Sequence, residues 1–173
     1  MRSTQSLAAK KQEILKSWFQ ATIDSYPAET ARFLKNQKDP FANPVGKTTY
    51  QSLDALVNAL TTGAGREVMA NALDPILRIR AVQSFTPSRA TSFVFSLKQI
   101  LRQHLPADGR DADTDMIDLD RQIDEMAMAA FDIYVACREK IFELKATESR
   151  NQFFGSLKRA GLIVETEADG PGF

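Results

Sequence analysis

The chain is short of the residues on which most enzymes and metal proteins depend. Its 173 residues include a single cysteine, Cys137, and a single histidine, His104. One cysteine cannot form an intramolecular disulfide, and one histidine without other ligands does not make a usual zinc site. A catalytic nucleophile, base and orienting carboxylate would have to be assembled around His104 alone. We therefore expect no metal, no cofactor and no catalytic residues, and hence no enzyme activity.

Net charge and long apolar runs are also absent. Lys+Arg and Asp+Glu both number 22, so the whole surface offers no electrostatic attraction to nucleic acid or to an anionic membrane. No apolar run approaches the roughly 20 residues that a bilayer-spanning helix needs. Residues 1–11 lack the apolar core of a signal peptide. These absences predict a cytoplasmic protein that binds neither nucleic acid nor membrane.

What the chain does have is helical periodicity. Hydrophobic residues make up 43% of it, which is enough for one packed core in a chain of this length. Apolar residues recur in steps of three and four, and no stretch of useful length alternates as a strand does. We therefore predict an all-α fold. The expected helices cover about residues 4–25, 28–34, 50–60, 67–73, 75–83, 87–105 and 114–149, with a short one after Gly155 at about 157–164.

Prolines and glycines mark the ends of these segments. Residues 39–46 hold two prolines and a glycine, which predicts an ordered turn with Phe41 and Val45 as apolar anchors. Thr86 followed by Pro87 is typical of a helix start, because threonine caps the first turn and proline suits its first position. The turns are therefore expected to be part of the packed domain.

Two short patterns resemble ligand sites without completing them. Gly46-Lys47-Thr48 looks like the end of a phosphate-binding loop, but the earlier glycine and the preceding strand are missing. Asp111, Asp113 and Asp115 alternate as in a calcium loop, which lacks its glycine and its final glutamate here. We interpret the first pattern as a helix start capped by a threonine, Thr48 or Thr49. The second is interpreted as the acidic N-terminus of the last helix.

The last long segment carries an apolar seam in alternating steps of four and three, the spacing of a coiled coil. A helix over residues 114–149 would be about 54 Å long, which exceeds the width of about 30 to 35 Å expected for a domain of this size. Its end is expected to project, bend or pack on a partner. The seam needs a facing helix from its own domain or from a second subunit. We predict a dimer or partner interface at Ile123, Met126, Ala130, Ile133 and Cys137.

Arginines cluster on two consecutive predicted helices, over residues 75–83 and 87–105. Arg78 and Arg80 are two residues apart and so cannot share a helix face. We expect one of them to pair with a carboxylate inside the domain and the other to face solvent or a partner. With Arg89 they form a candidate docking or effector-binding set, and the alternative is a solvated charged face.

Several short motifs, in this order, resemble the N-terminal domain of the RsbT co-antagonist (RsbRD-type) proteins over about residues 14–148. The resemblance implies a globin-like helical sensory domain without haem, usually dimeric, at the front of bacterial stress-signalling proteins that include stressosome components. There the last helix leads to an output domain, often of the STAS type. The motifs are Tyr26-Pro27-Ala28-Glu29-Thr30, residues 39–46, residues 78–83 and Phe85-Thr86-Pro87-Ser88, with Phe93 and Leu97-Lys98.

The domain plan expected from this resemblance is a sensory domain over residues 1–150, followed by a tail at 151–173 that is partly helical and then frayed. About 25 residues after the long helix leave no room for an output domain. The antagonism of a kinase partner that is typical of the family is therefore not carried over to this chain.

Two functions follow as hypotheses. The first is a non-enzymatic signalling domain of the stress-sensor type, which forms a homodimer and binds a regulatory protein or a small effector. The alternative is a carrier or sensor of an apolar ligand, a fatty acid or haem, in a globin-like pocket lined by some of the 11 phenylalanines. His104 could serve as an axial haem ligand, but its place at a helix end favours a capping role for the imidazole.

Overall fold

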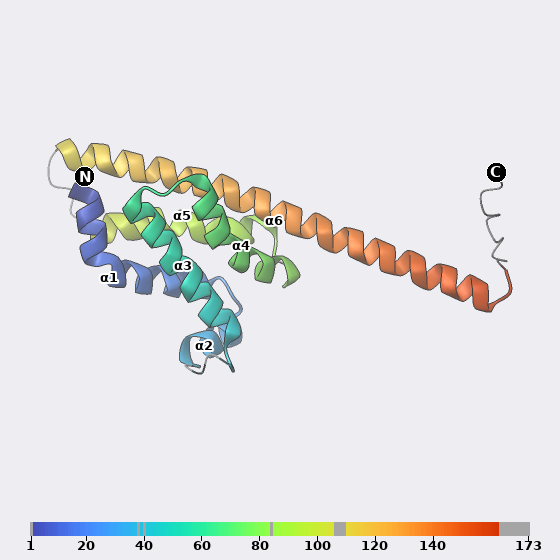
Figure 1. The fold of residues 1–173 in the computed structure, drawn as a ribbon. Coiled ribbons are helices and arrows are strands. Elements are labelled where there is room, and N and C mark those ends of the chain that lie inside the picture. The colour runs from blue at the N-terminus through green and yellow to red at the C-terminus, as the bar shows by residue number, and fades with distance from the viewer. Residues whose placement is uncertain (1, 38, 40, 84, 106–109, 163–173) are drawn as a thin grey trace, which may run out of the picture. The chain divides into compact units, whose positions relative to one another are not determined.

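The computed structural model describes residues 2–37, 39, 41–83, 85–105 and 110–162 (Figure 1). Within these residues the chain forms six α-helices and no strand, which confirms the all-α prediction. None of the described helices combines the length and the apolar character needed to cross a bilayer. The globin-like arrangement remains a prediction. The helices are α1 (Arg2–Asp24), α2 (Ala28–Asn36), α3 (Pro44–Thr62), α4 (Arg66–Val82), α5 (Pro87–His104) and α6 (Arg110–Arg159).

The chain divides into two compact units, residues 1–138 and 139–173. In the first unit, α1 packs on α2, α3 and α5 (Figure 1). Helix α3 also packs on α2 and α4, and α4 packs on α5. The part of α6 before residue 139 is attached to its neighbours by ion pairs. Arg66 of α4 reaches Asp132 at 3.2 Å and Lys98 of α5 reaches Asp124 at 2.7 Å. The first unit is therefore a bundle to which α1 and α6 both belong.

The core of this bundle is centred on Trp18 of α1, which is fully buried. Its indole Nε1 donates a hydrogen bond of 2.7 Å to the carbonyl of Phe93, and the two rings stack with centroids 6.2 Å apart. Each buried apolar side chain contributes roughly 1.5 to 3 kcal/mol. α1 also buries Leu7, Ile14, Leu15 and Ile23.

The start of α3 is organised by Asn43. Its Oδ1 accepts a hydrogen bond from the backbone N–H of Gly46 at 2.8 Å, and Pro44 occupies the first turn. Its Nδ2 donates to the carbonyls of Leu34 at 2.8 Å and Gln37 at 3.1 Å. One buried amide therefore caps α3 and fastens the end of α2 to it. The predicted threonine cap was wrong, since the helix begins one turn earlier than expected.

The turn before α3 differs from the prediction at Phe41. The side chain is 94% exposed, so it is not the apolar anchor that we expected. The turn is held by polar bonds instead, because the backbone N–H of Phe41 donates to Asp39 Oδ1 at 3.0 Å. Val45 is half-buried against the cluster of Ile23 and Leu34 and does act as an anchor.

Two predicted helix ends are wrong. Pro75 lies inside α4, which runs unbroken where we expected two short helices. The proline removes one backbone donor, and the buried Leu73, Ile76 and Leu77 hold both halves of the helix to the core. Gly155 likewise lies inside α6, which continues to Arg159 instead of giving way to a separate tail helix. At Pro75 packing overrides the local breaker, whereas Gly155 lies among exposed residues and costs the helix only about 1 kcal/mol relative to alanine.

The second unit, taken by itself, is described only to residue 162 and consists mainly of the C-terminal part of α6. Its side chains are mostly exposed, and several of these are large and apolar. Phe153 and Phe154 touch edge to face with centroids 6.3 Å apart. Further large apolar side chains that are exposed among its described residues are Phe142, Leu144 and Leu162.

Candidate functional site

The connection between α4 and α5, which we call the α4–α5 corner (residues 80–83 and 85–90), is built around Arg80. The side chain is fully buried, although arginine is rarely buried without a partner. Its guanidinium group fastens α4 to the start of α5 and to the end of α1. Nη1 donates to the carbonyls of Arg89 at 3.1 Å and Ala90 at 3.2 Å, and Nη2 donates to the carbonyl of Thr22 at 3.0 Å and to Ser25 Oγ at 2.9 Å.

Aromatic rings surround the same guanidinium group. Its central carbon lies 5.3 Å from the ring centre of Tyr26, 5.0 Å from that of Phe85 and 4.9 Å from that of Phe93. Rings at this distance attract a cation through their quadrupoles. Burial lowers the pKa of Arg80 and raises that of the Tyr26 hydroxyl. Within the described part of the chain, Arg80 has no carboxylate partner.

The other two candidate arginines lie at the surface. Arg78 pairs with Asp74 at 2.5 Å, one turn away on α4, and its side chain is mostly exposed. Arg89 donates from Nη2 to the carbonyl of Ser25 at 2.9 Å and lies over the Phe85 ring. The prediction that one arginine pairs with a carboxylate inside the domain was wrong in its assignment. The arginine with a carboxylate partner is exposed, and the buried one donates from its two Nη atoms to carbonyls and a hydroxyl.

Two side chains of α6 reach the α4–α5 corner from the other side. The Tyr134 hydroxyl donates to the carbonyl of Phe85. Arg138 Nη1 donates to the carbonyl of Ala81 at 2.9 Å. Side-chain hydrogen bonds, most of them to backbone carbonyls, therefore join α1, α4, α5 and α6 at this corner.

The predicted interface seam of α6 lies in the first unit and is partly buried there. Ile123, Met126 and Ala130 are buried within a single chain, so contact with a second subunit through them would require this unit to open. Ile133 and Cys137 are half-buried. The seam thus finds a facing surface in its own domain, one of the two options that its spacing allowed. An interface through the seam remains a prediction.

Burial raises the pKa of the Cys137 thiol, with a small opposing effect of Arg78. Since the thiolate is the reactive form, we expect iodoacetamide to alkylate Cys137 several-fold more slowly than it alkylates glutathione near neutral pH. Mass spectrometry of a time course measures this rate, and the same reaction in urea serves as the control. A native rate equal to that of glutathione would show that the thiol is open to solvent.

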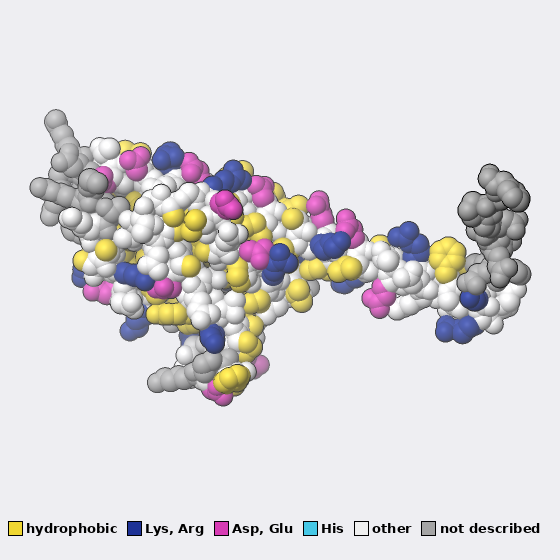
Figure 2. All heavy atoms as spheres, in the orientation of Figure 1, with side chains coloured by type: hydrophobic (Ala, Val, Ile, Leu, Met, Phe, Trp, Pro, Cys, Tyr) yellow, Lys and Arg dark blue, Asp and Glu magenta, His cyan; other side chains and the backbone are white. Residues whose placement is uncertain are grey.

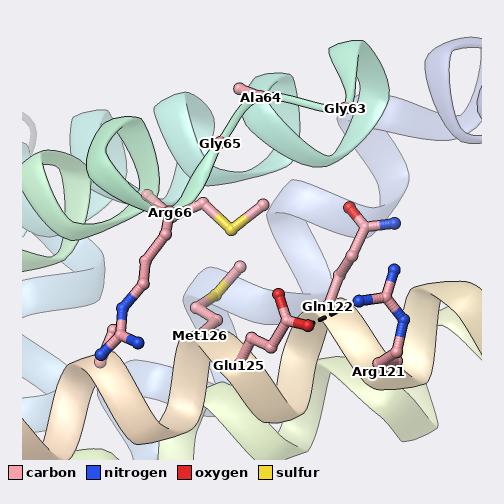
Figure 3. Close-up of a pocket in the computed structure, with 10 residues that line it drawn as sticks. Gly63, Ala64, Gly65, Arg66, Arg121, Gln122, Glu125 and Met126 are labelled. Carbon is pink, nitrogen blue, oxygen red and sulfur yellow. Dashed lines mark hydrogen bonds and ion pairs between the residues drawn. The ribbon is translucent and has the colours of Figure 1, made fainter.

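A pocket of about 270 Å³ lies where the α3–α4 turn faces α6 (Figure 3). The turn Gly63-Ala64-Gly65 forms one side, and Gly63 adopts the left-handed conformation that ends α3. Arg121 of α6 pairs with Glu125 at 2.6 Å at the opposite side. The lining is mixed, because Met69 and Met126 are buried at its base while the charged Arg121 and Glu125 are exposed at its rim. The remaining lining residues are Arg66, Gln122 and Ala129.

His104 connects the end of α5 to α1. Its Nε2 lies 3.0 Å from Ser17 Oγ, and its Nδ1 lies 3.5 Å from Glu13 Oε2. The ring therefore bonds to side chains of α1, and not to the carbonyls of its own last turn as we expected. Lys10, which donates to Glu13, lowers the pKa of that carboxyl, and His104 lowers it further.

The order serine, histidine, glutamate is that of a catalytic triad. However, Ser17 and Glu13 both lie within α1, whose backbone N–H groups are committed to the helix. Among the described residues, the backbone N–H groups next to Ser17 are those of α1 and are not free to form an oxyanion hole, so we assign the trio to packing. Metal ligation finds no support either, since the described residues hold no group of three or more candidate side chains. The side chains of Asp111 and Asp113 lie outside the described residues.

Comparison with known proteins decides the family. Residues 12–149 match the RsbT co-antagonist protein rsbRD N-terminal domain, which covers most of the chain. The chain belongs to this family. An uncharacterized protein of Archaeoglobus fulgidus is 25% identical over 144 residues, which cover 80% of this chain and 83% of that protein. No solved structure matches.

The rsbRD N-terminal domain is a regulatory signalling domain, so the chain is of the stress-signalling type. Residues 78–83 and 85–88, which carried the resemblance, lie in α4 and in the α4–α5 corner. Sequence reasoning missed Ser25 and Tyr134, which complete this corner. Tyr134 lies between the seam positions Ile133 and Cys137. Its burial could have been predicted by including the apolar residues that flank the seam on the helix surface. Ser25 offered no signal, because only the fold brings it to the arginines.

Proposed function

We propose that the chain is a non-enzymatic cytoplasmic regulatory domain that forms a homodimer and transmits stress signals by contact with another protein or a small effector. The family supports the regulatory part. The observation that supports contact as the means is an apolar row on the surface of α5 and α6. It consists of Phe95, Met128 and Phe131, whose side chains are 51%, 62% and 46% exposed.

Ion pairs set the register of this row. Lys98 pairs with Asp124, and Arg102 pairs with Asp120. The two helices therefore run antiparallel along this contact. One turn further in each helix, the same antiparallel register places Phe95 level with Met128. Phe131 follows one turn later on α6. Three large apolar side chains therefore continue the line of two charged pairs. Figure 2 shows apolar side chains interspersed with charged ones on the visible face of the first unit.

A second copy of the chain suits this row, because an isologous contact places each row against its counterpart and repeats the ion-paired rim on both sides. Apolar side chains at the centre and charges at the rim are typical of protein interfaces. The row is independent of the buried seam residues. Charged substitutions at Ile123 or Met126 should therefore unfold the first unit instead of only separating the subunits.

We expect the purified protein to be a dimer at tens of micromolar, and the double variant Met128→Glu, Phe131→Glu to be a monomer with unchanged far-UV circular dichroism. Burying two carboxylates in an apolar contact is unfavourable by several kcal/mol. Light scattering after size exclusion measures the mass. Val68→Glu, at a side chain of similar exposure on α4, is the matched control and should stay dimeric. A monomeric parent protein would remove the dimer from this proposal, and a dimeric double variant would place the contact elsewhere.

The pocket of Figure 3 supports the small-effector part of the proposal. Its volume is at the lower limit for small-molecule sites, and its charged rim suits a small polar molecule better than a fatty acid. A haem ligand finds less support, since both ring nitrogens of His104 face side chains of α1.

A further inference from the structure

Two arginines converge on one serine in the turn after α1. Arg80 Nη2 donates to Ser25 Oγ at 2.9 Å, and Arg89 Nη2 donates to the carbonyl of the same residue at 2.9 Å. They approach from different depths, because Arg80 is buried under the turn and Arg89 lies at the surface. Ser25 is thus contacted by two guanidinium groups, the side chain best suited to phosphate recognition.

This cluster has an excess of positive charge. Within the described part of the chain, neither arginine forms an ion pair, and the two charges repel each other. The carboxylate next in sequence, Asp24, is engaged by Lys35 at 2.5 Å. Arg80 also has its Nε buried without a hydrogen-bond partner. A buried cation without an anion is costly, and a phosphoryl group would remove that cost.

Ser25 is placed where such a group can be received. It lies in the turn between α1 and α2 and is half-buried. Its hydroxyl donates to the carbonyl of Thr22 at 2.6 Å and accepts from Arg80, whereas its backbone carbonyl accepts from the exposed Arg89. The half-buried serine therefore has one guanidinium group at its hydroxyl and a second at its backbone carbonyl.

We propose that Arg80 and Arg89 form a site for a phosphoryl group at Ser25, carried by phosphoserine at this position or by a free phosphate ion. The site does not depend on the dimer proposed above. Where the source is covalent, a protein kinase transfers the γ-phosphoryl group of a nucleoside triphosphate. The Ser25 Oγ–P bond forms, the bond from phosphorus to the bridging β–γ oxygen breaks, the nucleoside diphosphate leaves and the hydroxyl proton passes to a base.

The occupied site would act on the whole α4–α5 corner. A phosphoryl group bound by Arg89 would tighten the contact of α1 with the start of α5, since that arginine also lies over Phe85. The carbonyl of Phe85 accepts the bond from Tyr134 of α6. Occupancy is therefore expected to stabilise the first unit as a whole.

The test compares proteins that carry genetically encoded phosphoserine or serine at position 25, each with Arg89 or with Arg89→Gln. Trp18, the only tryptophan, reports thermal unfolding of the first unit. Phosphoserine at 25 is expected to raise Tm by about 3 to 6 °C, from the charge-assisted hydrogen bonds that it adds. Arg89→Gln should remove at least about half of that rise, because one of the two guanidinium groups is lost. Phosphoserine at Ser149, exposed on α6, is the charge-matched control and should leave Tm unchanged.

A parallel arm titrates inorganic phosphate against chloride at equal ionic strength, using the protein with serine at 25. A rise in Tm that depends on phosphate and on Arg89 assigns the site to the free ion. A rise only with phosphoserine assigns it to the modified residue. The proposal is overturned if phosphoserine at 25 lowers Tm or leaves it unchanged while inorganic phosphate also has no effect. It is also overturned if each rise persists in full in Arg89→Gln.

Discussion

Replacing Arg80 with alanine is expected to cost about 3 to 5 kcal/mol of the free energy of unfolding. The substitution removes the donors of four hydrogen bonds and leaves a space among three aromatic rings. The carbonyl of Thr22 keeps its bond from the Ser25 hydroxyl, and each lost hydrogen bond from the charged guanidinium group is worth about 1.5 to 3 kcal/mol. Urea unfolding followed by Trp18 fluorescence measures the change in the first unit.

Two further variants separate the causes. Arg80→Met keeps most of the side-chain volume but has no hydrogen-bond donor. We expect its free energy of unfolding to be at least about 2 kcal/mol lower than that of the parent protein. Arg78 lies on the same helix but at the surface, so Arg78→Ala should change the free energy of unfolding by no more than about 0.5 kcal/mol relative to the parent protein. If Arg80→Met were as stable as the parent protein, the hydrogen bonds of the guanidinium group would not be what holds the corner.

Asn43→Ala is expected to lower the free energy of unfolding by about 2 to 4 kcal/mol, the second largest effect predicted for this chain. The amide caps α3 and donates to the carbonyls of Leu34 and Gln37, so its loss leaves one helix uncapped and removes two donors. Gly46→Ala should act on the same point, since a Cβ there would lie 2.4 Å from Asn43 Nδ2. The same unfolding measurement applies to both variants.

The double variant of Asn43 and Gly46 provides the decisive comparison. Asn43→Ala removes the three atoms that lie nearest to the added Cβ, so the two costs should sum to more than the cost of the double variant. Asn58→Ala is the control, because its amide is exposed and bonds only to Asp54 on the same helix. Strict additivity would mean that Gly46 is needed for its backbone freedom and not for the close approach of Asn43.

The helices of this chain could be predicted where a local signal and the packing agree. Thr86 with Pro87 begins α5 as the sequence predicts, because a threonine cap is set by the backbone of its own turn. The end of α3 is equally local, since Gly63 adopts the left-handed conformation there. Pro75 misled the prediction, because the cost of a missing backbone donor was outweighed by buried leucine and isoleucine on both sides. Such a balance depends on tertiary contacts that the local sequence does not report.

The candidate site was predictable only in part. The stretch from Arg78 to Phe85 could be singled out from its residues, and it does contain the arginine around which the corner is built. Which arginine is buried depends on the phase of α4 against α1, and that phase is a property of the assembled bundle. The bonds of Arg80 join residues 9 to 58 positions apart in the chain. No periodicity along the sequence indicates pairs of that kind.

The two bonds from α6 to the α4–α5 corner have a mechanical consequence. Tyr134 and Arg138 are four residues apart, so they leave α6 from the same face at successive turns. One attachment would allow the helix to pivot, but two fix both its rotation and its sliding. Within the first unit, α6 therefore cannot turn about its axis or shift along it without breaking at least one of these bonds. The corner sets the rotational phase of the helix at Arg138.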